Sequence, residues 1–294
     1  MRKRAIGAGV VAVGSGIAIT MLAITPALAG PVVVKGITTH VVSTTVTAPG
    51  METAEADATC PAGELLTGGG YTITGSATDW RIYLDAPINT STWTVEPVNF
   101  SANPLTFTSY AICAMNAPGS TAISKYTTNI VDANVNVPAN QTGEADATCP
   151  VGQLRTGGGY DVYNVSPNWS IYTNGPLNND AWNVEIDNEV PLATTFDSFA
   201  MCLAKKNGNP ITKLAVSTVD TFGTAPANGS QAIDVSCPAN SLMTGGGHVI
   251  DSIGQDWSIQ KSAPISTNDW RVKATDTDNF SRDFNTLAVC LAKV

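Results

Sequence analysis

The stretch that decides the fold is Cys149-Pro150-Val151-Gly152-Gln153-Leu154-Arg155-Thr156-Gly157-Gly158-Gly159-Tyr160. Its pattern, C-P-x-[GN]-x-L-x-T-G-G-G-[YH], occurs again from Cys60 to Tyr71 and from Cys237 to His248. In every copy a second cysteine follows the first by 53 residues, at positions 113, 202 and 290. The first cysteines are 89 and 88 residues apart, so each repeat has the length of a small domain.

The first 29 residues have the composition of an export signal. Arg2, Lys3 and Arg4 precede an apolar run from Ala5 to about Ile24, and Ala27-Leu28-Ala29 follows. A basic start, an apolar core and a small-x-small end are typical of a secretory signal peptide. We expect cleavage after Ala29, which predicts a secreted, extracellular protein that could associate with the cell surface. The alternative is an uncleaved N-terminal anchor, because the run is long enough to span a bilayer.

The charge of the remaining chain is strongly negative. Residues 30–294 keep 12 basic and 24 acidic residues, which gives a net charge of −12. Because such a chain repels phosphate backbones, we do not expect a nucleic-acid partner. Divided by repeat, residues 30–119 carry −5, residues 120–208 carry −5 and residues 209–294 carry −2.

The cysteines predict a disulfide framework. Six cysteines in an exported chain suit disulfides and allow 15 connectivities. The constant spacing of 53 residues selects one bond in each repeat. The expected pairs are Cys60–Cys113, Cys149–Cys202 and Cys237–Cys290.

The predicted fold class is all-β. Alternation with a period of two recurs along each repeat, as in Ala54, Ala56, Ala58 and Cys60, and indicates half-buried strands. No long stretch after residue 29 shows a helical period. Six or seven short strands in about 85 residues point to an antiparallel β-sandwich or a partly closed barrel. We therefore predict three tandem β domains at residues 30–119, 120–208 and 209–294, each with one disulfide.

The turn after the first cysteine predicts a left-handed residue. Proline suits the second position of a turn, and Gly63, Gly152 and Asn240 occupy the fourth. The three glycines that follow resemble a phosphate-binding loop, but neither a lysine nor a helix comes next. We expect instead a β-bulge, or a place where a bulky side chain such as tryptophan crosses bare backbone.

Two tryptophans occur in every repeat. Trp80, Trp169 and Trp257 begin W-x-I strands, and 13 residues later a second set begins W-x-V strands at positions 93, 182 and 270. A proline turn separates each pair, which predicts a hairpin. Core packing is the favoured interpretation for both sets. A sugar-stacking platform is the alternative, and it makes Trp80, Trp169 and Trp257 the candidate ligand-binding residues.

Catalytic chemistry is poorly represented. The only histidines, His40 and His248, lie at non-equivalent positions, and the cysteines are committed to disulfides. We therefore predict no catalytic residue, no metal site and no cofactor. The pair Glu55 and Asp57 recurs in the second repeat, but on the outward face of a strand, where a solvated surface is expected.

The set of motifs resembles that of secreted bacterial repeat proteins of uncharacterised function. The resemblance spans nearly all of residues 35–293 and implies export and disulfides, but it carries over no functional residue. Because triplication favours binding over catalysis, the leading hypothesis is a secreted, non-catalytic protein that binds a glycan or another surface polymer through loops. The alternatives are a structural envelope or matrix component that self-associates and, third, an extracellular hydrolase. The oligomeric state stays open.

Overall fold

The structure is a computed structural model that describes residues 32–75, 79–164, 166–251 and 257–294. The expected signal peptide lies outside these residues. The first repeat contains β1 (Ile37–Ala48), β2 (Ala56–Thr59), β3 (Leu65–Ile73), β4 (Trp80–Pro87), β5 (Thr92–Asn99) and β6 (Leu105–Asn116). A short 3-10 helix, η1 (Ala122–Lys125), leads to β7 (Tyr126–Val137), β8 (Gln141–Thr148), β9 (Leu154–Val162), β10 (Trp169–Pro176), β11 (Ala181–Asn188) and β12 (Thr194–Lys205). The third repeat contains β13 (Leu214–Ala225), β14 (Ser230–Ser236), β15 (Ser241–Ile250), β16 (Trp257–Pro264), β17 (Asp269–Asp276) and β18 (Arg282–Lys293).

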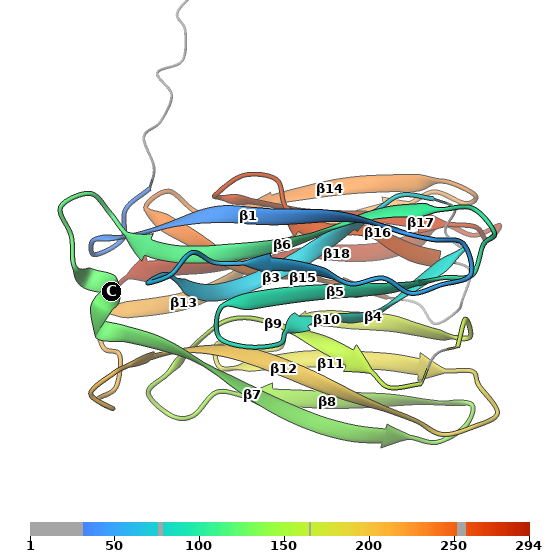
Figure 1. Ribbon diagram of the computed structural model, residues 1–294, viewed down its shortest axis with the longest axis horizontal. Coiled ribbons are helices and arrows are strands. Elements are labelled where there is room, and N and C mark those ends of the chain that lie inside the picture. Colours follow the sequence, from blue (N-terminus) through green and yellow to red (C-terminus); the bar gives the residue numbers. More distant parts are fainter. Residues whose placement is uncertain (1–31, 76–78, 165, 252–256) are drawn as a thin grey trace, which may run out of the picture. The chain divides into compact units, whose positions relative to one another are not determined.

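These strands form three six-stranded sheets, and every sheet is shared by two repeats (Figure 1). We name each sheet by the repeats that build it. Sheet 1/3 has the order β1-β6-β3-β16-β17-β14, sheet 1/2 has β2-β5-β4-β9-β12-β7, and sheet 2/3 has β13-β18-β15-β10-β11-β8. All the strand pairings are antiparallel. The three repeats therefore surround an approximate threefold axis.

Each repeat is a two-layered β unit with one disulfide between its layers. In the first repeat, β1-β6-β3 belongs to one sheet and β2-β5-β4 to another. Cys60 directly follows β2 and Cys113 lies on β6, so their disulfide ties the two layers together. The other repeats contain Cys149–Cys202 and Cys237–Cys290. The predicted all-β fold with one disulfide in each repeat is confirmed.

The strand that carries the second cysteine is central in each half-sheet. β6 lies between β1 and β3, and β12 and β18 occupy the equivalent places. Their sequences are apolar on both faces because one face meets the disulfide layer and the other meets strands of a neighbouring repeat. Among the described residues, no helix is long and apolar enough to cross a membrane.

The three glycines of each motif have different neighbours. The first glycines meet at the threefold axis: a Cβ built on Gly68 would lie 3.0 Å from the Cα of Gly245. The same Cβ on Gly157 would lie 2.8 Å from Gly68, and on Gly245 it would lie 3.0 Å from Gly157. The three backbones thus touch in a ring, which closes only because no side chain intervenes.

The second glycine accommodates the second tryptophan of its own repeat. A Cβ on Gly69 would lie 2.3 Å from the Trp93 ring, and Gly158 faces Trp182 in the same way. The register shift between Leu66 and Gly68 places a bulge beside this contact. The predicted bulge and tryptophan crossing are therefore confirmed, and the second tryptophan set supplies the ring.

The third glycine lies where two repeats join. A Cβ on Gly159 would lie 1.9 Å from the carbonyl oxygen of Asp85 on the neighbouring repeat. The pairing at this seam is short, since β4 and β9 exchange only the pairs Leu84–Asp161 and Asp85–Tyr160. The other two seams, β10–β15 and β3–β16, have two pairs each as well. Bare backbone thus allows the strands of different repeats to approach.

The left-handed turn residue is also confirmed. Gly63, Gly152 and Asn240 have φ values of 87°, 88° and 65°. Glycine has no Cβ to clash in this region, and asparagine is among the residues that tolerate it. The alternation of Gly and Asn at this position follows directly from the backbone conformation.

Candidate functional site

The candidate ligand-binding tryptophans are buried. Trp80, Trp169 and Trp257 expose 3%, 2% and 6% of their surface. Together with Tyr71 and Tyr160, among others, they line a cavity of about 40 Å³ at the threefold axis. A water molecule needs about 10 to 15 Å³ of such space, so the cavity has room for a few waters and not for a sugar ring. The alternative of an exposed stacking platform is therefore wrong.

The reason for this burial is the neighbouring repeat. Tyr83 of the first repeat packs edge-on against Trp169 of the second, with ring centroids 5.1 Å apart. Tyr172 of the second repeat packs against Trp257 of the third at 5.9 Å. These rings belong to the interface between repeats. Aromatic pairs of this geometry add to the stability gained from area burial.

The second tryptophans reach a buried polar position near the seam. Trp93 Nε1 donates to Asp85 Oδ1 at 2.8 Å, and Trp182 Nε1 donates to Asn174 Oδ1 at the same distance. Asn174 Nδ2 also donates to Asp85 Oδ2 at 3.2 Å. Burial raises the pKa of Asp85 to about 7, although both hydrogen bonds act in the opposite direction. Asp85 is therefore a buried carboxyl whose charge changes near neutral pH.

His248 is the second buried ionisable group in this region. It occupies the position of Tyr71 and Tyr160 in the third repeat and exposes 1% of its surface. Its Nδ1 lies 3.5 Å from Ser262 Oγ. Burial lowers the pKa of His248 to about 3, so the ring is neutral at physiological pH.

Arg155 is a buried cation without an ion pair among the described residues. Its Nε and Nη2 donate to the carbonyl oxygen of Asn178, and Nη2 also donates to Thr218 Oγ1 at 3.2 Å. The guanidinium carbon lies 5.7 Å from the centre of the Trp182 ring. Burial lowers the pKa of Arg155 to about 9, and the nearby Asp180 raises it by less. These contacts show that the Arg155 side chain packs in the core, where β9 of the second repeat meets β13 of the third.

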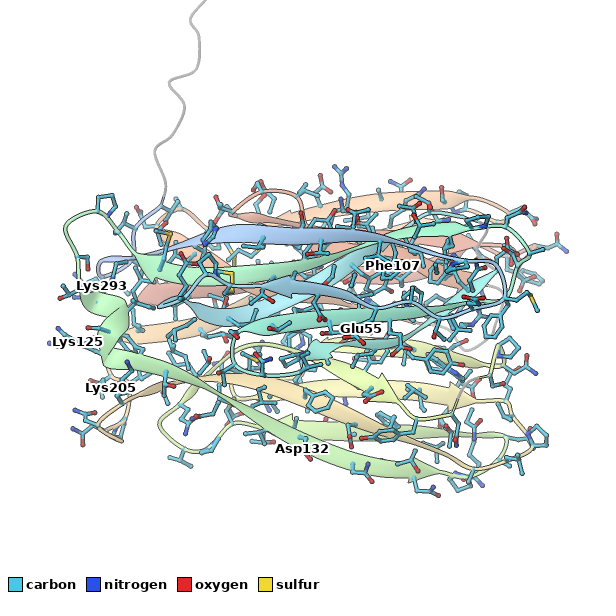
Figure 2. The ribbon with its side chains drawn as sticks, viewed as in Figure 1. Glu55, Phe107, Lys125, Asp132, Lys205 and Lys293 are labelled. Carbon is cyan, nitrogen blue, oxygen red and sulfur yellow. A yellow bond between two sulfur atoms is a disulfide. The ribbon has the colours of Figure 1, made fainter. Side chains whose placement is uncertain are left out.

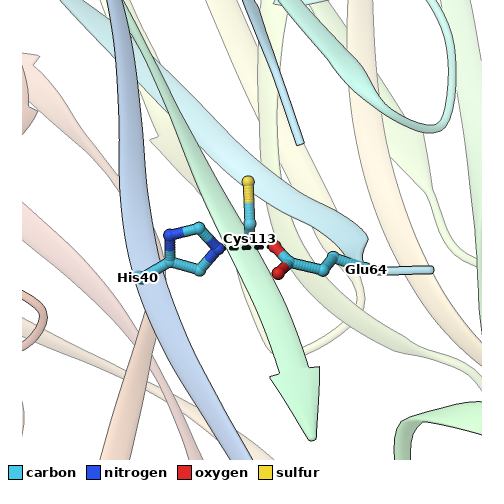
Figure 3. A group of neighbouring side chains, drawn as sticks. All are labelled: His40, Glu64 and Cys113. Carbon is cyan, nitrogen blue, oxygen red and sulfur yellow. Dashed lines mark hydrogen bonds and ion pairs between the residues drawn. The ribbon is translucent and has the colours of Figure 1, made fainter. Parts of the chain in front are cut away.

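His40, Glu64 and Cys113 come together near the first disulfide (Figure 3). His40 Nε2 lies 2.5 Å from Glu64 Oε2. The sulfur of Cys113 is bonded to Cys60, so it is not a thiolate that could bind a metal. In the second repeat the same two positions form a neutral pair, in which Asn129 Nδ2 donates to Gln153 Oε1 at 3.1 Å. His40 and Glu64 are therefore one instance of a polar contact between the edge strand of a repeat and the turn after its first cysteine, and this contact explains why they lie together.

The residues that the sequence analysis did not select are lysines at one end of the sheets. Figure 2 shows Lys125, Lys205 and Lys293 at the end where η1 and the connectors lie. Lys35 and Lys213 belong to the same group. The charge of the neighbouring Lys293 is the main cause that lowers the pKa of Lys35, followed by burial and by the charge of Lys213. Lys206 joins them through the hydrogen bond from its N–H to the Lys125 carbonyl oxygen.

We call these six residues the lysine end. They account for half of the 12 basic residues of the chain after residue 29. All are exposed except Lys205, which is partly buried. Glu64 and Asp180 lie in turns of the same end and Asp269 begins β17 there, so the excess of positive charge is moderate. The sequence does contain a signal for this cluster, since lysines recur at the first and last positions of the repeats.

A polar hollow of about 220 Å³ lies within the lysine end. Lys205, Lys206, Asn129 and Gln153 line it, together with backbone from the turn at Gly152. Ammonium and amide groups of this kind can donate hydrogen bonds to phosphate, carboxylate or hydroxyl oxygens.

Glu55 and Asp57, the carboxylates considered for hydrolysis, are exposed on the outer face of sheet 1/2. Their placement agrees with a solvated strand face. Comparison with protein-family models gave no match, and comparison with functionally curated proteins gave none either.

Proposed function

We propose that this is a secreted, non-catalytic protein that binds an anionic polymer of the cell surface through its lysine end. The observation that carries the proposal is the gathering of six lysines at one end of a chain whose net charge is otherwise strongly negative. Positive potential concentrated at one end orients the molecule toward a polyanion and raises its rate of association.

The fold supports a binding role more than a catalytic one. The loops between the paired tryptophans lie at the lysine end, since the amide of Cys60 donates to Ser91 and that of Cys149 donates to Asp180. Disulfides and shared sheets hold these loops on a rigid frame, which lowers the entropy lost on binding. The three repeats thus present one composite surface.

The test is retention of residues 30–294 on immobilised dextran sulfate, with unmodified dextran as the neutral reference. The double variant Lys125→Glu with Lys293→Glu should lose most of its retention. The matched control is Lys261→Glu with Lys273→Glu, which changes the net charge equally but lies on the outer face of sheet 1/3. Equal loss in both variants would mean that only net charge matters and would contradict the proposal. Retention on unmodified dextran would favour a neutral glycan instead.

A further inference from the structure

The outer faces of the three sheets have equivalent positions but different charges. One outward residue from each of six neighbouring strands forms a row across the middle of each sheet. In sheet 1/3 the row is Thr45, Thr108, Thr72, Lys261, Lys273 and Ala232. In sheet 1/2 it is Asn134, Asp197, Asp161, Leu84, Glu96 and the neighbouring Glu55. In sheet 2/3 it is Phe222, Asn285, Val249, Thr173, Glu185 and Glu144.

All three rows contain like charges directly opposite each other. Lys261 pairs with Lys273 across β16 and β17, Asp161 with Asp197 across β9 and β12, and Glu185 with Glu144 across β11 and β8. Like charges at directly paired positions destabilise a sheet. None of the ion pairs among the described residues includes any of these six side chains. Each face therefore carries charge that the fold itself does not neutralise.

The rows differ in sign and in number of charges: the row of sheet 1/3 has two lysines, that of sheet 1/2 has four carboxylates and that of sheet 2/3 has two. We call the outer face of sheet 1/3 the basic face. Arg271 forms an ion pair with Asp234 there, and Lys261 and Lys273 form none among the described residues. We call the outer face of sheet 1/2 the acidic face. Its outward carboxylates are Asp57, Asp132, Glu55, Glu96 and Asp161. Asp197 lies on the same face but exposes only 7% of its surface and accepts hydrogen bonds from Asn134 and Tyr163. Burial, followed by the charges of Asp197 and Glu96, raises the pKa of Asp161 to about 6.

The arrangement of the acidic face does not favour a bound metal ion. Among the described residues, His40, Glu64 and Cys113 form the one group of three whose possible ligand atoms converge. The carboxylates of the acidic face are spread along the row, one or two strands apart. A partner that matches them must present positive charges with a similar spread.

We propose that the basic face of one molecule docks on the acidic face of a second copy of this chain. Lysines on adjacent strands of one face then meet carboxylates on adjacent strands of the other, at the same strand spacing. A hollow of about 390 Å³ beside Lys261 and Lys273, lined also by Thr72, Thr74 and Gln260, receives the acidic side chains. The basic face is separate from the lysine end, so this association does not depend on the binding of a polymer.

The two faces belong to different parts of one chain, so the contact is heterologous. Each added copy leaves one basic and one acidic face free, and assembly can continue beyond a dimer. Its strength must also depend on salt. The screening length is about 30 Å at 0.01 M ionic strength and about 3 Å at 1 M.

The experiment is sedimentation velocity of residues 30–294 over a range of concentrations and ionic strengths. The wild-type chain should associate at about 0.01 M salt and dissociate at about 1 M. The variants Lys261→Glu with Lys273→Glu, and Glu55→Lys with Glu96→Lys, should each be monomeric. Mixed together they should associate again, because one variant keeps the natural acidic face, the other keeps the natural basic face, and their reversed faces are complementary too.

The matched control is Glu144→Lys with Glu185→Lys, at the equivalent positions of sheet 2/3, and it should associate like the wild type. If this control is monomeric while Glu55→Lys with Glu96→Lys still associates, sheet 2/3 is the partner surface and the proposal is overturned. A wild-type chain that stays monomeric at low salt overturns it too. Near-ultraviolet circular dichroism checks folding, and Lys273→Gln, which should weaken association at least severalfold, replaces a double variant that does not fold.

Discussion

Replacing Asp85 with asparagine should reveal a pH dependence of stability that the wild-type protein conceals. Two buried groups act in opposite directions. The folded-state pKa of Asp85 is about 7, above its ordinary value of 3.8, and that of His248 is about 3, below its ordinary value of 6.5. Asp85 therefore stabilises the fold most below pH 3.8, and this contribution is lost as the pH rises through 7. His248 stabilises it most above pH 6.5, and this contribution is lost as the pH falls toward 3.

Asp85 and His248 contribute similar amounts to the free energy of unfolding. One pKa unit corresponds to about 1.4 kcal/mol, so Asp85 contributes about 4 kcal/mol and His248 about 5 kcal/mol over their full ranges. Between about pH 4 and 6.5 the slopes of Asp85 and His248 nearly cancel, so together these two groups should change the wild-type free energy of unfolding little in this window. Relative to the wild type, Asp85→Asn keeps the histidine effect without its counterpart and should lose about 3 kcal/mol of stability from pH 6.5 to 4. Relative to the wild type, His248→Tyr should instead lose about 3 kcal/mol from pH 4 to 7.

The equivalent repeats show that both substitutions fit their sites. Asparagine occurs at the Asp85 position as Asn174, where it accepts the tryptophan hydrogen bond, and tyrosine occurs at the His248 position as Tyr71 and Tyr160. The assay is urea unfolding followed by tryptophan fluorescence at fixed ionic strength, with the disulfides intact. Asp161, whose pKa is about 6, contributes equally in all three proteins and cancels in the comparison. Parallel pH profiles for the wild type and Asp85→Asn would refute the reasoning.

Three further predictions concern single features of the fold and are measured by the same unfolding assay. Gly158→Ala should lower the free energy of unfolding by about 3 kcal/mol or more, because the new Cβ would lie 2.2 Å from the Phe199 carbonyl oxygen. In the control Gly208→Ala the new Cβ meets nothing within 4 Å, and the positive φ alone should cost about 1 kcal/mol. Equal losses in the two variants would argue against the close approach at Gly158. Arg155→Met introduces the residue type found at the equivalent position 243, and it should leave stability unchanged or raise it by about 1 to 4 kcal/mol. The reason is that it removes a buried cation that has no ion pair among the described residues. A large loss of stability would show that the guanidinium contacts stabilise the fold. Replacing Cys149 and Cys202 with serine should lower the free energy of unfolding by about 4 kcal/mol, the chain-entropy value for a loop of 53 residues. A loss below about 1 kcal/mol would mean that the unfolded chain is already compact without the disulfide.

Features that depend on one repeat could be predicted from the sequence. The disulfides follow from a spacing that is constant in three copies, and the positive φ follows from the exchange of Gly for Asn at position 240. The crossing of a tryptophan over bare backbone follows from the glycines and the bulky rings around them. In each case the cause and the effect lie within the same 53-residue loop, so local chemistry is sufficient.

Features that depend on two repeats could not be predicted in the same way. The seams involve only two residue pairs each, and their signal is a bare backbone at Gly70, Gly159 and Gly247. An isolated sandwich with a bulge would show the same residues. For this reason the sequence favours burial of Trp80, Trp169 and Trp257, but it does not show that a neighbouring repeat covers them.

The charged faces illustrate the same limit most clearly. Net charges of −5, −5 and −2 for the three repeats suggest surfaces that differ only in degree. Each outer face, however, combines half of one repeat with half of another. The half-sheet β16-β17-β14 brings Lys261, Lys273 and Arg271 beside the threonines of β1, β6 and β3, while the carboxylates of β2 and β5 join those of β9, β12 and β7. Charge that is averaged along the chain is thus separated in space by the pairing between repeats, and only this separation gives one molecule two complementary faces.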